Sequence, residues 1–184
     1  MAEFGSEALA GYTIAVRLFI FTLLPIWGLS NAAATLVGQN LGARQPDRAE
    51  RSVWITGWVN MGFLLGVSVV YVSFSEPLVR IFTSEPGVVA AGAEALRIWS
   101  YGYPIYAWAM VMPQAFNGAG DTMTPTKINF FCFWLFEIPL AYLLALELGM
   151  GTTGVYWSVV RAESLAGLVG IVLFRLGRWK QTMV

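Results

Sequence analysis

The chain contains no histidine, one cysteine and few charges, and each shortage excludes a class of protein. Without histidine it lacks the commonest catalytic base and metal ligand. Cys132 has no second cysteine to pair with, so the sequence predicts neither a disulfide nor a thiolate metal site. Only 12% of the residues are charged, against about 25% in soluble domains. The net charge is zero, which leaves no basic field for nucleic acid.

Long apolar stretches occupy most of the sequence instead. Each is close to the ~20 helical residues that cross ~30 Å of hydrocarbon. None alternates apolar and polar residues as a membrane β-strand does. The sequence therefore predicts an all-α, polytopic membrane helical bundle within residues 1–184. Its five transmembrane helices are expected at residues 18–37, 53–74, 98–116, 128–146 and 155–174.

Basic residues gather in alternate connections between these stretches. One set comprises Arg44, Arg48, Arg51, Lys127, Arg175, Arg178 and Lys180. The other connections hold Arg80, with Arg97 at the mouth of a span. The positive-inside rule then places the C-terminus in the cytoplasm and the N-terminus outside, in what we expect to be a prokaryotic plasma (inner) membrane. The odd number of spans suits the C-terminal portion of a longer membrane protein.

Three ionisable residues lie inside the apolar stretches: Glu137, Arg161 and Glu163. At that depth each costs ~2.5 to 3.5 kcal/mol on insertion scales, so it should face the bundle interior or a wet cavity. Arg161 and Glu163 lie roughly 200° apart around one helix and cannot comfortably pair. We therefore expect an ion pair between Arg161 and Glu137. Glu163 or Glu137 then becomes a candidate for coupling cation movement, with a purely structural role as the alternative.

Aromatic and amide side chains supply candidates for a substrate cavity. Tyr101 and Trp108 are seven residues apart, on one helical face, and could stack against flat organic cations. Anchoring at the membrane interface is the alternative role for such residues. Asn31 and Gln114 are amides within apolar spans, where they could line the cavity or bond across helices.

Small and cyclic residues predict irregularities in the helices. Four prolines inside spans can bend them: Pro25, Pro104, Pro113 and Pro139. The Gly62/Gly66 pair has the GxxxG spacing that permits close helix packing. Gly42 and Gly120 are expected to cap the C-termini of helices.

Four segments resemble the multidrug and toxic compound extrusion (MATE) family of cation-coupled exporters. They are, in chain order, residues 33–43 (AATLVGQNLGA), 77–83 (PLVRIFT), 96–98 (LRI) and 116–125 (FNGAGDTMTP). The resemblance implies a fold of twelve helices in two lobes around a central cavity. This chain is similar to helices eight to twelve of the C-terminal lobe, so the N-terminal lobe and the seventh helix are missing. The cation-binding carboxylates that many members carry on the first or seventh helix then lie outside it, and residues 98–116 lack the acid that others carry on the tenth.

The resemblance also implies a function. It suggests part of a Na⁺- or H⁺-coupled antiporter that exports amphipathic, often cationic, organic compounds by alternating access. The implied partners are the lipid bilayer, these small substrates and the missing lobe, with no cofactor apart from the coupling ion. One alternative is a flippase for lipids or lipid-linked saccharides, although the spans lack clustered basic residues for a pyrophosphate headgroup. Another is a truncated chain without activity of its own. No nucleophile–base pair or phosphate-binding loop indicates an enzyme.

The charge asymmetry generates a topological prediction. In a Cys132→Ser background, a cysteine at Ser84 should react with an impermeant thiol reagent added outside intact cells, whereas one at Ala43 should react only after the cells are opened. The reason is that basic residues flank Ala43 and are sparse near Ser84. Labelling at Ala43 with protection at Ser84 would show that the orientation is reversed.

Overall fold

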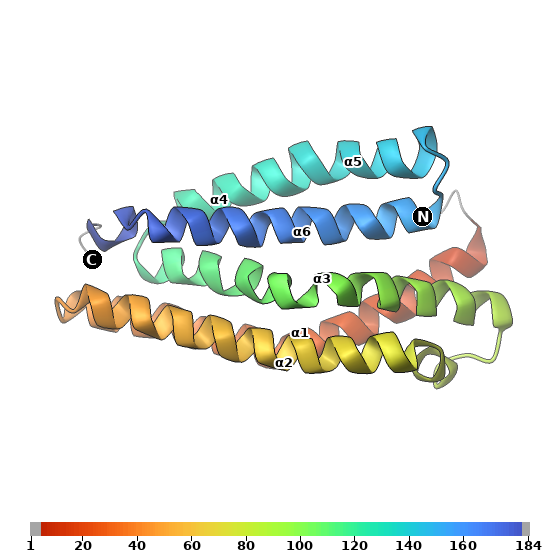
Figure 1. Cartoon of the computed structure of the whole chain (residues 1–184), viewed down its shortest axis with the longest axis horizontal. Helices are drawn as coiled ribbons and strands as arrows, with labels where there is room; N and C mark the ends of the chain where they lie inside the picture. Colours follow the sequence, from red (N-terminus) through yellow and green to blue (C-terminus); the bar gives the residue numbers. More distant parts are fainter. Residues whose placement is uncertain (1–4, 182–184) are drawn as a thin grey trace.

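The computed structural model of the chain describes residues 5–181 as long helices joined by short connections (Figure 1). The helices are α1 (Ser6–Gly42), α2 (Pro46–Arg80), α3 (Pro86–Gly118), α4 (Met123–Asn129), η2 (Phe130–Glu137), α5 (Ile138–Tyr142), η3 (Leu143–Glu147), α6 (Thr152–Arg175) and η4 (Arg178–Gln181). The run from α4 to η3 is continuous, and we name it the rod. Every predicted span falls within one long helix or within the rod, which confirms the all-α prediction.

The helices differ in how apolar they are. α1, α2, the rod and α6 are each long and apolar enough to cross a membrane. Their outer surfaces carry large apolar side chains, such as Phe21 and Trp134, that are about two-thirds exposed. α3 has 33 residues but does not meet the same measure, and it packs against α1, α2 and α6. Most of its serine, glycine and aromatic residues are buried against these neighbouring helices, with Tyr101 as an exception.

The connections divide between the two ends of the bundle. The turns after α1 and α3 lie at the same end as the C-terminal turn η4, and the turns after α2 and the rod lie at the other end (Figure 1). The basic segments that we expect in the cytoplasm thus share one end. Which side of the membrane that end faces remains a prediction, and Met1 lies outside the described residues.

Short-range signals set where the helices begin and end. α3 starts at Pro86, where a missing N–H costs nothing. After α3, Gly120 adopts φ +80°, as expected of a capping glycine. The Asp121 carboxylate then accepts hydrogen bonds from the Thr124 N–H and hydroxyl, at 3.0 and 2.5 Å, and so caps α4. After α1, however, the positive φ of +58° falls on Arg44 and not on the predicted Gly42.

The helical irregularities only partly follow the predicted prolines. α2 is interrupted at Phe74 (φ −126°, ψ 25°), three residues before Pro77, which was not among the expected sites. Within the rod, η2 and η3 are π-helical segments, which are wound more loosely than an α-helix and lie on either side of Pro139. A Cβ added at Gly62 or at Gly66 would meet nothing within 4 Å among the described residues, so this pair does not mark a close helix contact. Close packing on α2 instead uses Gly57, where an added Cβ would overlap the Trp108 ring.

Polar side chains connect α1 with α2 inside the bundle. Thr22 Oγ1 lies 2.6 Å from Tyr71 Oη, and Tyr71 also donates to the Leu18 carbonyl at 3.1 Å. Closer to the end of the bundle that holds η4, the Asn60 side chain donates a hydrogen bond to Ser30 Oγ at 3.1 Å. Bonds of this kind contribute roughly 0.6 to 2 kcal/mol each within a bilayer. They hold α1 and α2 together as one support for α3.

The tight approach at Gly57 yields a stability prediction. Gly57→Ala should lower the free energy of unfolding by about 1 to 3 kcal/mol, because the added methyl group overlaps the buried Trp108 ring. Gly62→Ala is the matched control on the same helix, since nothing lies within 4 Å of its Cβ position. Thermal unfolding of the detergent-solubilised chain measures both, and equal melting temperatures for the two variants would contradict the packing.

Candidate functional site

Glu163 lies on the face of α6 that meets α3. Val160, Glu163, Gly167 and Gly170 follow one another at spacings of three and four residues, which places them on one side of the helix. A Cβ at Gly167 would lie 2.9 Å from the Ile105 carbonyl oxygen, and one at Gly170 would lie 2.8 Å from the Met112 Cβ. The two glycines thus allow α6 to approach α3 closely, and this approach directs Glu163 into the bundle.

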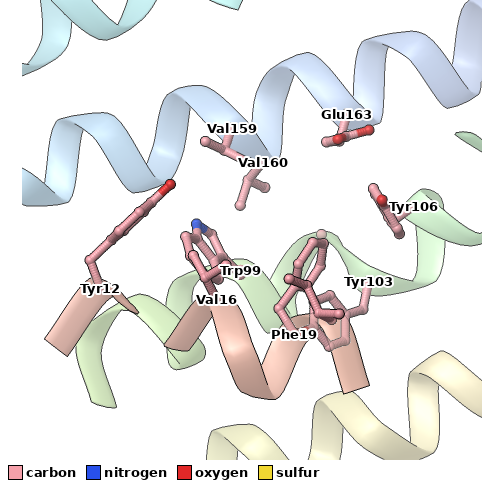
Figure 2. A pocket seen from close by; sticks show the side chains of 11 residues that line it. Tyr12, Val16, Phe19, Trp99, Tyr103, Tyr106, Val159, Val160 and Glu163 are labelled. Carbon is pink, nitrogen blue, oxygen red and sulfur yellow. The ribbon is translucent and has the colours of Figure 1, made fainter. Parts of the chain in front are cut away.

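Glu163 opens onto a cavity between α1, α3 and α6, which we name the first cavity (Figure 2). The first cavity measures ≈ 250 Å³. Its walls are mainly aromatic and valine side chains, and Glu163 is the one charged group among them. The residues are Tyr12, Val16, Phe19, Ile20, Trp99, Gly102, Tyr103, Tyr106, Val159, Val160 and Glu163. A carboxylate in such surroundings is poorly solvated and favours a cation or a proton as its companion.

The aromatic wall is fixed by contacts between its own rings. Phe19 lies 5.5 to 5.8 Å from Trp99, Tyr103 and Tyr106, measured between ring centroids. Trp99 also meets the Tyr12 ring edge-on, at 5.6 Å. The Trp99 Nε1 and Tyr103 Oη are buried without a hydrogen-bond partner among the described residues. Buried polar groups usually have a partner, so these two unpaired donors are unusual features of the aromatic wall.

A second cavity of ≈ 410 Å³ lies farther along the bundle, between α1, α3, α6 and the rod. Glu163 and Tyr106 line both cavities, so they form the partition between them. In Figure 2 the Tyr106 side chain rises from α3 towards Glu163 on α6. Gln114, predicted to line a cavity, borders the second cavity together with Asn129. The second cavity therefore offers amide groups where the first offers aromatic rings.

The ion pair expected between Arg161 and Glu137 does not form among residues 5–181. Arg161 is exposed on α6, and its guanidinium lies over the Trp157 ring at 6.0 Å from the centroid. Glu137, at the end of η2, is half-buried. Its charge interacts with Glu163 and Tyr12, although it lines neither cavity. Two acids thus lie near one another without a basic partner between them.

The other predicted cavity residues are separated in the structure. Trp108 points towards α2, where it is buried against Trp54 and Trp58 at 5.3 and 5.5 Å. Tyr101 is half-exposed and stacks on Trp157 of α6 at 6.1 Å. Their shared helical face therefore does not create a shared wall. Asn31 is exposed on α1 and lines neither cavity.

Sequence reasoning missed most of the aromatic residues that surround Glu163. Trp99, Tyr103 and Tyr106 belong to the same aromatic-rich segment as Tyr101 and Trp108. The seven-residue spacing favoured Tyr101 and Trp108 as the cavity residues instead. Tyr103 lies four residues after Trp99, and Tyr106 three residues after Tyr103, which is the spacing of one helical stripe. That stripe was the available signal. The contributions of Tyr12 and Phe19 depend on tertiary packing.

The sequence has many relatives among bacterial transporters. It is 27% identical over 181 residues to the probable multidrug resistance protein NorM of Thermotoga maritima, a match that covers 98% of this chain and 39% of that protein. The chain thus spans well under half the length of this relative. The relatives are transporters. The helices of this chain resemble one lobe of a transporter rather than an enzyme.

Solved structures show the same arrangement of helices. The MATE transporter ClbM in complex with Rb⁺ superposes with a TM-score of 0.88 at 25% identity, over 97% of this chain and 42% of that one. The Vibrio cholerae MATE transporter VcmN in its bent form gives a TM-score of 0.87 at 23% identity, over 95% and 40%. Residues 1–143 match the sequence profile of the MatE family. The chain is an integral membrane protein that belongs to the MatE family.

Proposed function

We propose that this chain is most of one lobe of a cation-coupled exporter that exchanges Na⁺ or H⁺ for amphipathic, often cationic, organic compounds. The observation that carries the proposal is the position of Glu163, which lines two cavities and forms no ion pair among residues 5–181. The name of the Thermotoga relative supports multidrug export. We place the protein in the prokaryotic inner membrane with the C-terminal end of the bundle in the cytoplasm.

Glu163 is the better of the two candidate coupling acids. A carboxylate buried among aromatic rings is costly when charged and unpaired, so binding a proton or a metal cation relieves a large penalty. Tyr106 lies beside it in both cavities and could donate a hydrogen bond or complete a coordination shell. Glu137 reaches neither cavity, and its negative charge acts on Glu163 from outside. In this mechanism Glu137 increases the attraction of the site for cations without binding them.

The missing lobe is the expected partner of the exposed polar residues. Arg161 and Asn31 lie within predicted spans but are exposed on this chain. Because a charge in contact with lipid tails is expensive, another part of the transporter should cover Arg161. The chain covers 39% of the Thermotoga relative, so most of that protein has no counterpart here. Substrate would then pass between the two lobes.

The role of Glu163 can be tested in the full-length parent transporter. Glu163→Gln should reduce export driven by a Na⁺ or pH gradient to the background of cells without the transporter, because the amide can neither titrate nor carry the charge that holds a cation. Glu137→Gln is the comparison variant and should weaken export only partly, since Glu137 lines neither cavity and contributes only its charge.

Gradient-driven efflux of a fluorescent cation from inverted vesicles is the measurement, normalised to the abundance of each variant in the membrane. Both variants should be normally abundant, because neither removes the partner of an ion pair that the structure contains. Unchanged coupling in Glu163→Gln, or loss of coupling confined to Glu137→Gln, would reverse the assignment of the two acids.

The incomplete lobe makes a further prediction about residues 1–184 alone. Expressed in a strain that lacks its own efflux pumps, the chain should not lower drug accumulation, because a pathway between two lobes needs both. The parent transporter expressed from the same promoter provides the positive control. A clear fall in accumulation with the chain alone would disprove the two-lobe requirement.

A further inference from the structure

A third cavity lies between the rod and α6, at the end of the bundle that holds η4. It measures ≈ 460 Å³ and shares no residue with the first cavity. Its depth is apolar, with Phe131 and Cys132 on the rod facing Val169 and Leu173 on α6. Lys127 and Arg178 also border it, and both are exposed. The third cavity therefore combines an apolar interior with a basic entrance.

The two basic side chains at this entrance are free to bind an anion. Neither Lys127 nor Arg178 forms an ion pair with any residue in the described part of the chain. One carboxylate, that of Asp121, also borders the third cavity. Its two oxygens already accept hydrogen bonds from the Thr124 N–H and hydroxyl, which direct it to the start of α4. The balance of charge at the entrance is positive.

Arg178 is carried on a turn that is anchored independently of any ligand. In η4, Lys180 forms ion pairs with Asp47 and Glu50 of α2, at 3.3 and 2.6 Å. Trp179 stacks on Phe174 with ring centroids 4.5 Å apart and donates to the Phe174 carbonyl at 2.9 Å. The turn thus faces α2 with Lys180 while Arg178 borders the third cavity. A site fixed in advance loses less entropy when it binds its ligand.

We infer that the third cavity binds one anionic phospholipid, with the phosphate between Lys127 and Arg178 and an acyl chain between the rod and α6. Charge complementarity selects an anionic headgroup, and the apolar interior selects a ligand with a hydrocarbon tail. Basic pockets between transmembrane helices near the membrane surface are typical sites for such lipids. The volume lies within the range of small-molecule sites, roughly 300 to 1,000 Å³. This site is separate from Glu163 and does not depend on the proposed transport mechanism.

Native mass spectrometry of the full 184-residue chain, titrated with phosphatidylglycerol or phosphatidylcholine of matched acyl chains, tests the inference. Phosphatidylglycerol should bind at least tenfold more tightly. Lys127→Gln and Arg178→Gln should each weaken its binding about fivefold, and the double variant about thirtyfold, because each basic residue near the surface contributes a similar increment. Binding of phosphatidylcholine should change little.

Two further variants separate the site from general effects of charge and folding. Arg51→Gln removes a basic residue at the same end of the bundle that does not border the cavity, so it should leave the affinity unchanged. Val169→Trp fills the apolar interior and should weaken phosphatidylglycerol binding while both basic residues remain. Circular dichroism checks that each variant keeps its helical content.

Several results would overturn the inference. Equal affinity of the wild-type chain for the two lipids would show that the charge of the headgroup does not determine binding. A loss in Arg51→Gln as large as in Lys127→Gln would indicate general electrostatic attraction. Displacement of phosphatidylglycerol by an equal concentration of inorganic phosphate would show an anion site that makes no use of the acyl chain.

Discussion

The close contact between α3 and α6 is the constraint on which the arrangement around Glu163 depends. Helices in a bilayer gain little from hydrophobic burial, so they associate through close packing and hydrogen bonds. Three positions without a Cβ permit that packing: Gly102 meets Val160, Gly167 meets the Ile105 carbonyl, and Gly170 meets Met112. A larger residue at any of them would push the helices apart. Glu163 would then lose its position beside the aromatic side chains of α3.

Much of the fold could be predicted from the sequence because its signals are local or set by the membrane. The lengths of the apolar stretches predict five helices, and Pro86, Gly120 and Asp121 predict where two of the connections begin and end. The inward direction of Glu163 follows from the cost of exposing a carboxylate to lipid. The same reasoning fails for Arg161, which is exposed on this chain. The cost of exposing a charge to lipid does not say which part of a transporter shields that charge.

The partners of individual side chains could not be predicted, because they depend on which helices become neighbours. Tyr101 and Trp108 share a face by spacing, yet one meets α6 and the other meets α2, since α3 is surrounded by both. The sequence predicts a pair between Glu137 and Arg161 because they are opposite charges in neighbouring spans, but the pair does not form among the described residues. The Arg161 guanidinium lies over the Trp157 ring instead, a cation–π contact that the four-residue spacing on α6 could have suggested.

The anchoring of α6 limits how the region around Glu163 can move. At one end, η4 attaches α6 to α2 through the ion pairs of Lys180. At the other, the Thr153 hydroxyl donates to the Glu94 carboxylate of α3. In the described part of the chain, no side-chain hydrogen bond or ion pair joins the rod to α1 or α2, and the rod packs mainly against α6. It also contains the loosely wound η2 and η3 segments, a type of geometry that often accompanies functional sites. A change of charge at Glu163 would therefore displace the rod, which carries Glu137, more readily than it would displace α6.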